Sequence, residues 1–263
     1  DAVCDTKNFT DYIISEIFTA NTSWGHTIAL FRKRSPTGKW RWFPHDYDRG
    51  FDLGNVNGTA MEWATSTNGQ DWSNPAWGTL FLRKMLENDD FKQRFITRFA
   101  DHLYVTYHPL MVNQRVDQLA GNIRKELPYH VGKWAGTHSS YGDGIPSVAF
   151  WEKEVDALKQ FGASRNAFMW ENLNSFFTLN GSAGLEVSVS DAAHGRVRLH
   201  DLVIPQYPWS GRYFNDRPFT LTAEAKPGFH FLRWEKAVDS LKTILPAGSA
   251  WKYLDATTPP QAD

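Results

Sequence analysis

The apolar residues change their spacing once along this chain of 263 residues, and that change limits the folds open to it. As far as about residue 178 they recur every three or four positions, as Phe91, Phe95 and Phe99 do. This spacing places them on one face of a helix. From Leu185 onward they alternate with polar residues, as in strands with one buried face. The sequence therefore predicts an α+β chain whose mostly helical part precedes a small all-β part.

The segment at 180–184, Asn-Gly-Ser-Ala-Gly, separates the two patterns and has the composition of a turn. After it, Gly and Pro turns recur about every 8–12 residues, a spacing typical of a small β-sandwich. We therefore predict a mostly helical domain at 1–179 and a β-sandwich-like module at 183–245, with its last strand at 229–234. A linker and the start of a truncated further domain are expected at 246–263.

Local patterns divide the first domain into helices and one hairpin. Two β-like runs, 27–32 and 39–43, flank a Ser-Pro-Thr-Gly segment that favours a tight turn. Asn8 has the residue type of an N-cap for the first helix. Helices are expected at 8–20, at 75–107 in two pieces around 88–90, at 109–127 and at 148–177, with irregular chain at 55–74 and 132–146.

Charge and cysteine content exclude several kinds of protein. Lys and Arg number 28 against 29 Asp and Glu, so no basic excess favours binding to nucleic acid. No apolar run approaches the roughly 20 residues of a membrane-spanning helix. The single cysteine, Cys4, permits neither an internal disulfide nor a cysteine-based zinc site. The chain opens on Asp1 without a signal-peptide pattern, so we expect a piece of a longer protein.

The loops before and after the predicted hairpin carry the residues of chemical interest. Loops that enter and leave a hairpin lie side by side, so residues 21–26 and 46–48 are expected to meet. The carboxylates of Asp46 and Asp48 are hard oxygen ligands of the kind Mg²⁺ prefers, and phosphoryl transfer requires such a metal beside the group that orients the acceptor. The alternatives are a solvated turn, or a calcium-like loop with Asp52, Asn55 and Asn57, although the full calcium-loop pattern is absent.

The run from Gly38 to Asp48, GKWRWFPHDYD, resembles the signature of the spore-coat protein H (CotH) kinase family, an atypical branch of the kinase-like fold. Four further segments are similar to the family: 8–12, 21–24, 80–86 and 91–95. The resemblance covers about residues 5–178 and implies the fold of the larger lobe of a kinase, with a short hairpin inside it.

The resemblance implies ATP- and Mg²⁺-dependent transfer of phosphate to protein hydroxyls. Asp46 is the implied ligand of the metal across the nucleotide phosphates, with Asp48 as a second carboxylate. The catalytic aspartate of the family falls on Ser23, and its helper asparagine falls near His26 or Thr27. Serine cannot replace a carboxylate that orients the acceptor, whereas His26 is a candidate base. With the nucleotide-gripping lobe also absent, a degenerate or pseudokinase-like domain is expected.

The second part of the chain carries a resemblance of its own. Residues 185–235 resemble a β-rich repeat module of large secreted bacterial proteins, and 250–255 resemble the opening of a further β-sandwich. The implied location is extracellular or at the bacterial cell surface. The implied partners are a protein substrate or cell-surface component and the neighbouring domains of the same parent chain.

The twelve tryptophans support a different hypothesis, a non-catalytic adhesion or glycan-binding module. Clusters of tryptophan line glycan sites, but they also fill cores. The candidates for such a platform are Trp40, Trp42, Trp63, Trp72 and Trp77, of which at least half are expected to pack in the core. A structural spacer between neighbouring domains is a third possibility.

Overall fold

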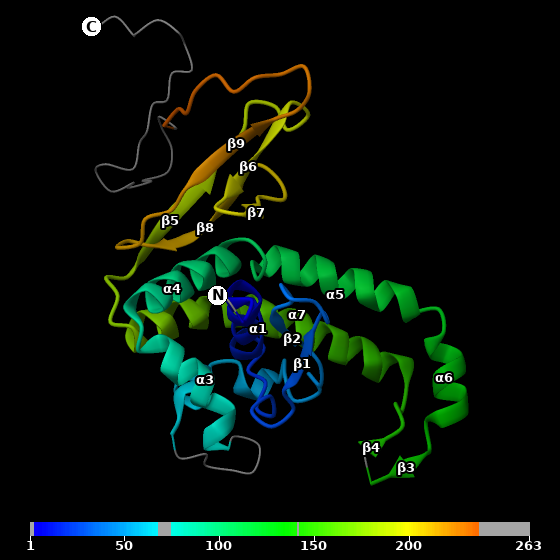
Figure 1. Cartoon of the computed structure of the whole chain (residues 1–263). Helices are drawn as coiled ribbons and strands as arrows, with labels where there is room; N and C mark the ends of the chain where they lie inside the picture. Colours follow the sequence, from blue (N-terminus) through cyan, green and yellow to red (C-terminus); the bar gives the residue numbers. More distant parts are fainter. Residues whose placement is uncertain (1–2, 68–74, 141, 237–263) are drawn as a thin grey trace, which may run out of the picture.

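The computed structural model describes residues 3–67, 75–140 and 142–236. Within them the chain is α+β, as the apolar spacing predicts. Helices and two short hairpins form the larger body, and small antiparallel sheets lie against one side of it (Figure 1). The further domain expected from 246 lies outside the described residues. No helix in the described parts of the chain combines the length and hydrophobicity needed to cross a membrane.

The larger body confirms most of the elements predicted from local pattern. In chain order these are α1 (Thr6–Phe18), β1 (Ala29–Arg32), β2 (Trp40–Phe43), the short 3-10 helix η1 (Leu53–Asn55), α2 (Ala60–Thr65), α3 (Ala76–Leu86), α4 (Asp89–Tyr104), α5 (Pro109–Ile123), α6 (Leu127–Trp134), the two-residue strands β3 (His138–Ser139) and β4 (Gly142–Asp143), and α7 (Val148–Phe176). The predicted hairpin is present, because β1 and β2 pair antiparallel with Leu30 opposite Trp42.

Several segments differ from the sequence-based expectation, among them α6, a separate helix that continues into the stretch from 132 that is expected to be irregular. Helix α2 lies within 55–74, and β3 and β4 form a minimal hairpin within 132–146, although both stretches were expected to be irregular. Helix α2 spans only six residues, of which Met61 and Ala64 are buried, and so short a segment gives no clear periodic signal. Residues 229–234 contain no strand, so the strand predicted there from the alternating pattern is wrong.

The start of α1 also differs from the prediction and fixes the hairpin to the helix. Asp5, and not Asn8, is the N-cap, since its carboxylate accepts the backbone N–H of Asn8 at 3.0 Å. The Asn8 side chain instead pairs with the backbone of Trp42, accepting its N–H at 2.6 Å and donating to its carbonyl at 3.3 Å. The Asn8 amide thus makes the two hydrogen bonds that the backbone of a neighbouring strand would make, and it joins β2 to the first turn of α1.

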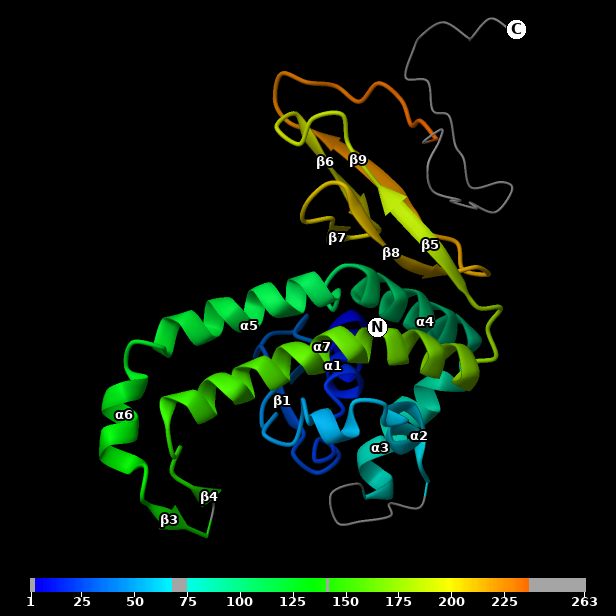
Figure 2. The same cartoon turned by 180° about the vertical axis from the view of Figure 1, so that it is seen from behind.

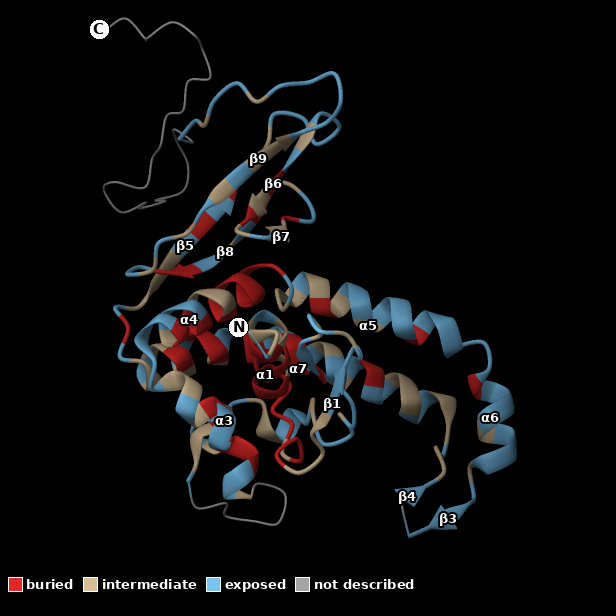
Figure 3. Ribbon diagram, viewed as in Figure 1, coloured by how far each residue is buried: buried red, intermediate tan, exposed pale blue. Residues whose placement is uncertain are grey.

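Helix α1 lies in the middle of the body, with α7 crossing it and α4 beside it (Figures 1 and 2). Burial is concentrated on α1 and α4, whereas α5 and α6 are largely exposed (Figure 3). The fully buried apolar side chains of α1 include Phe9, Ile13, Ile14, Ile17 and Phe18. Burying each such side chain contributes about 1.5–3 kcal/mol, so α1 and the loop that follows it are held firmly.

The β-rich part consists of two small antiparallel sheets. Strand β5 (Ser182–Val187) pairs with β8 (Trp209–Phe214), and β6 (Gly195–Leu199) lies between β7 (Leu202–Val203) and β9 (Leu221–Ala225). These sheets share one hydrophobic core with the helices. The indole N–H of Trp209 donates to the carbonyl of Tyr104 at 2.9 Å, and the Tyr104 hydroxyl donates to the carbonyl of Leu185 at 3.1 Å.

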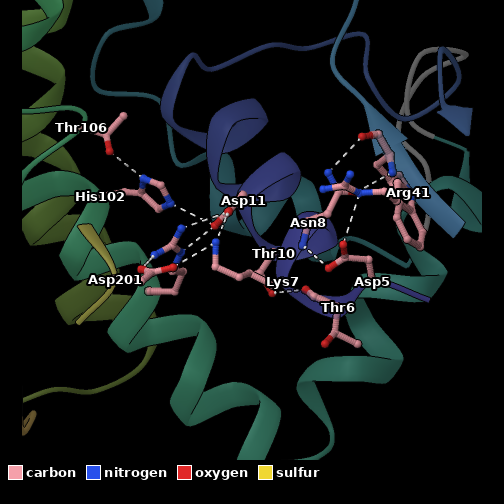
Figure 4. Close-up of polar contacts among 12 residues, drawn as sticks. Asp5, Thr6, Lys7, Asn8, Thr10, Asp11, Arg41, His102, Thr106 and Asp201 are labelled. Atoms are coloured by element: carbon pink, nitrogen blue, oxygen red, sulfur yellow. Dashed lines mark hydrogen bonds and ion pairs between the residues drawn. The ribbon is translucent and has the colours of Figure 1, made fainter. Parts of the chain in front are cut away.

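A cluster of charged residues reinforces this junction between the helices and the sheets (Figure 4). The guanidinium of Arg98 on α4 donates to both carboxylate oxygens of Asp11 on α1, at 2.6 and 3.0 Å, and pairs with Asp201 in the turn between β6 and β7. His102 contacts Asp11 at 3.0 Å. Burial alone would raise the pKa of the Asp11 carboxyl, but the hydrogen bonds from His102 and Arg98 hold it well below its usual range.

Candidate functional site

The loops on either side of the hairpin meet in the structure. The first loop (residues 19–28) precedes β1, and the second loop (residues 44–52) follows β2. The side-chain amide of Asn21 donates to the carbonyl of Asp46 at 3.2 Å, and the N–H of Phe51 donates to the carbonyl of Thr19 at 2.8 Å. The juxtaposition expected from hairpin geometry is therefore present, and it is made by the backbone of the second loop.

Asn21 is the residue through which these contacts run, and it is buried. Its nitrogen donates to Glu16 at 2.9 Å and to the Asp46 carbonyl. Its oxygen accepts the backbone N–H and the hydroxyl of Ser23, each at 3.1 Å. A side-chain amide has two donors and two acceptor positions, and Asn21 uses all four. The backbone N–H of Ser23 also fixes which end of the amide is the oxygen.

Ser23 and His26, the candidate catalytic residues, lie inside the first loop. Ser23 is buried and its hydroxyl is engaged by Asn21. Its carbonyl accepts the Thr27 hydroxyl at 3.2 Å and the backbone N–H of His26 at 3.5 Å, so 23–27 is a compact turn. His26 is half-buried. The catalytic roles assigned to both residues stay predictions.

Helix α3 covers the same turn at very short range. A Cβ atom added at Gly78 would lie 2.1 Å from the carbonyl oxygen of Gly25. Only glycine permits this approach of the two backbones. The neighbouring Trp24 is buried against Trp63, with ring centroids 5.4 Å apart. The first loop is therefore a packed part of the body.

Asp46 and Asp48, the candidate metal ligands, have exposed side chains in the second loop. The backbone of Asp46 is left-handed, with φ of 62°, a conformation that costs energy for residues with a side chain and is enriched at functional sites. The Asp46 carbonyl is turned to Asn21 while its carboxylate stays exposed.

The donor chemistry of the second loop fits one kind of metal site. Among the described residues, no three His, Cys, Asp or Glu side chains gather into a metal cage. Mg²⁺ is usually held by one or two carboxylates together with phosphate oxygens and water. Asp46 and Asp48 therefore suit a magnesium ion that arrives with a nucleotide, and do not suit a metal held by the protein alone.

Glu16 is a residue of the site that the sequence analysis missed. It is 1% exposed, one carboxylate oxygen accepts from Asn21, and the other has no hydrogen-bond partner among the described residues. Burial raises the pKa of Glu16 to about 7, opposed by Asn21, Tyr47 and Tyr12 and reinforced by the charge of Asp46. The available signal was a carboxylate on the apolar face of the first helix, four residues after Tyr12.

Two further side chains fix the loops to α1. The hydroxyls of Tyr47 and Ser15 are 2.6 Å apart, and burial, with the charge of Glu16, raises the pKa of Tyr47. Arg165 of α7 is fully buried and donates to the carbonyls of Ile17 and Phe18 at the end of α1, and to those of Val56 and Gly58 after the second loop. Without a carboxylate partner among the described residues, burial lowers the pKa of Arg165 to about 10.

Comparison with known proteins places the chain in a family. The family model described as CotH kinase protein matches residues 1–169, so the chain belongs to that family. The resemblance drawn from the run between Gly38 and Asp48 is confirmed at this level. No curated protein and no solved structure matches the chain. The matched region holds α1 to most of α7, including both loops, and ends before the sheets.

The tryptophans proposed as a glycan platform do not form one surface in the described residues. Trp42 is buried and Trp63 packs on Trp24. Trp40 on β2 and Trp77 on α3 are exposed, and Trp72 lies outside the described residues. The arrangement favours packing for at least two of the five.

Proposed function

We propose that this chain is the larger-lobe portion of a CotH-type kinase-like domain, with Asp46 and Asp48 as the ligands of a magnesium ion bound together with a nucleotide. One observation carries the proposal. The exposed carboxylate of Asp46 belongs to a residue with a left-handed backbone, and the carbonyl of that residue is hydrogen-bonded to Asn21 of the first loop. Family membership supports nucleotide and metal use in general terms. When bound, the magnesium ion neutralises charge on the phosphates.

The residues of the first loop favour weak or absent phosphate transfer. Protein kinases orient the acceptor hydroxyl with a carboxylate, and the corresponding residue here is Ser23, whose hydroxyl is buried on Asn21. A serine hydroxyl has no useful basicity near neutral pH. We therefore assign the isolated chain a pseudokinase-like role. It retains binding of metal and nucleotide but transfers phosphate to protein hydroxyls weakly or not at all. Within the same proposal, the parent protein acts outside the bacterial cell or at its surface, on a protein partner.

Calorimetric titration tests the proposal directly. The chain is titrated with Mg²⁺ and ATP together, and with ATP in the presence of a chelator. Wild type should bind nucleotide only with the metal, and Asp46→Asn should bind at least tenfold more weakly because a charged ligand is lost. Asp90→Asn removes one negative charge from the exposed first turn of α4 and is the matched control.

Two results would contradict the proposal. One is the same metal dependence in wild type and Asp46→Asn. The other is no metal-dependent binding in wild type, even when the parent protein supplies its upstream lobe. Binding of a glycan array that depends on the exposed Trp77 would instead favour the adhesion module.

A further inference from the structure

The second loop contacts α1 and the first loop at three points. Tyr47 reaches Ser15 through its hydroxyl, and Phe51 reaches Thr19 through its backbone. The third contact, between the Asn21 amide and the Asp46 carbonyl at 3.2 Å, acts on the residue that would hold the metal. The first two contacts fix the path of the loop, and the third fixes the peptide plane after Asp46.

That peptide plane restrains the backbone of the residue from which the Asp46 carboxylate projects. With φ at 62°, Asp46 is in a backbone region that L-residues leave unless their surroundings hold them there. If its carbonyl turned away from Asn21, the residue would be free to relax to negative φ, and the carboxylate would move with it. A hydrogen bond to this carbonyl is therefore a restraint on the direction of the side chain.

Asn21 can apply the restraint because it is itself held on every side. It is 3% exposed, and its four hydrogen-bonding positions are all used. Glu16, 1% exposed, receives the second N–H of the amide at 2.9 Å from the last turns of α1. A buried side chain with no alternative partner arrangement is a rigid support for the group it contacts.

We infer that Asn21, anchored by Glu16, is a positioning residue that holds Asp46 in its left-handed conformation and so presets its carboxylate for a divalent cation. The part of the inference that concerns the cation rests on the proposed function. The part that concerns the backbone conformation of Asp46 rests on the geometry alone. Asn21 touches neither metal nor nucleotide in this scheme. Its role is to fix the backbone of the residue that does.

The variant Asn21→Asp separates positioning from simple electrostatics. It has the shape of asparagine and keeps an oxygen facing Ser23, but it removes both donors, toward Glu16 and toward the Asp46 carbonyl. It also adds a negative charge near the site, which by Coulomb attraction alone would tighten cation binding. Positioning predicts the opposite sign, a loss of at least tenfold in Mn²⁺ affinity measured with a non-hydrolysable ATP analogue. Equal or tighter Mn²⁺ binding would overturn the inference.

A second measurement uses the chain without any ligand. Backbone ¹³C and ¹⁵N chemical shifts of Asp46 report its φ by NMR spectroscopy. We expect positive φ in wild type and in Asp90→Asn, and a shift to negative or averaged φ in Asn21→Asp. A positive φ retained in Asn21→Asp would overturn the inference. If wild type binds no Mn²⁺, the proposed function fails, while the NMR comparison still decides the positioning role.

Substitutions at Glu16 keep the test decisive where Asn21→Asp does not fold. Glu16→Gln retains an oxygen acceptor for Asn21, so Asp46 should keep its chemical shifts and its Mn²⁺ affinity within about threefold. Glu16→Leu removes the acceptor and should shift Asp46 and weaken Mn²⁺ binding as Asn21→Asp does. Unchanged Asp46 chemical shifts and Mn²⁺ affinity in Glu16→Leu would show that Asn21 needs no anchor, and a loss in Glu16→Gln equal to that in Glu16→Leu would show that the oxygen acceptor is not what matters; either result would overturn that part of the inference.

Discussion

Charged groups that are buried or half-buried occur in two regions of the described chain, and they are paired with opposite charge in one region but not in the other. At the junction of helices and sheets, Asp11 meets Arg98 and His102, and Asp101 meets His200 at 2.9 Å and the Tyr213 hydroxyl at 2.7 Å. Beside the hairpin, Glu16 has no cationic partner among the described residues, and one of its oxygens lacks a hydrogen bond.

The pKa shifts record this difference. The pKa of Asp11 lies below its usual range, since hydrogen bonds to His102 and Arg98 overcome the effect of burial, whereas burial wins at Glu16 and raises its pKa to about 7. A buried charge that is paired with an opposite charge favours a rigid structural contact. A buried charge without such a partner lowers the stability of the fold, and groups of this kind are common at functional sites. The comparison separates a junction whose charges are paired from a region beside the hairpin that keeps an unpaired buried carboxylate.

The largest effect is expected at the junction. Arg98→Met removes the least exposed of the cations shared by Asp11 and Asp201 and leaves them the exposed Lys7. Breaking such a partly buried ion pair from one side costs about 3–4 kcal/mol. Urea unfolding at pH 7 measures the change. The control is Arg124→Met, which removes an exposed pair with Glu152 and should leave stability unaltered. Equal losses in the two variants would remove the distinction between the regions.

The next effect is expected at Glu16 and depends on pH. Its pKa is raised from 4.5 in the unfolded chain to about 7 in the folded one, so below pH 4.5 both states are protonated and no penalty exists. As the pH rises from 4.5 to 7 the unfolded chain ionises first, and folding loses roughly 3 kcal/mol. Unfolding free energies of wild type minus Glu16→Gln, measured from pH 4 to 8, should show this loss. If this difference in unfolding free energy did not change with pH, the pKa of Glu16 would be the same in the folded and unfolded chain, and the prediction would be wrong.

The elements that the sequence predicted depend on neighbours along the chain. Helices α1, α4 and α7 follow from apolar spacing, and the meeting of the two loops follows from the hairpin between them. The candidate ligand Asp46 was found because an acidic loop after a strand is a local feature.

The missed features depend on contacts between distant residues. Arg165 contacts carbonyls 107 to 148 positions away, and no local pattern reports such partners. Asn8 was expected to cap a helix, but a partner 34 residues away takes its side chain. The docking of the sheets on α4 through Trp209 and Tyr104 likewise arises from packing that periodicity does not encode.

The smallest effect sharpens the comparison at the junction itself. Asp101 raises the pKa of His200, and Asp201 adds to the shift while burial and Arg98 oppose it. This contribution to stability is complete below the unfolded pKa near 6.5 and is lost as the pH rises through the higher folded value. His200→Asn suits the left-handed backbone there, with φ of 50°, and should cost about 1 kcal/mol at pH 6. Urea unfolding of both proteins at pH 6 and 8.5 should show that the stability of wild type minus that of His200→Asn falls by this increment at the higher pH, because Glu16 titrates equally in both proteins and cancels in the difference. The same pH dependence in both proteins would show that His200 does not titrate against Asp101, and the junction would then rest on the Arg98 cluster and on packing.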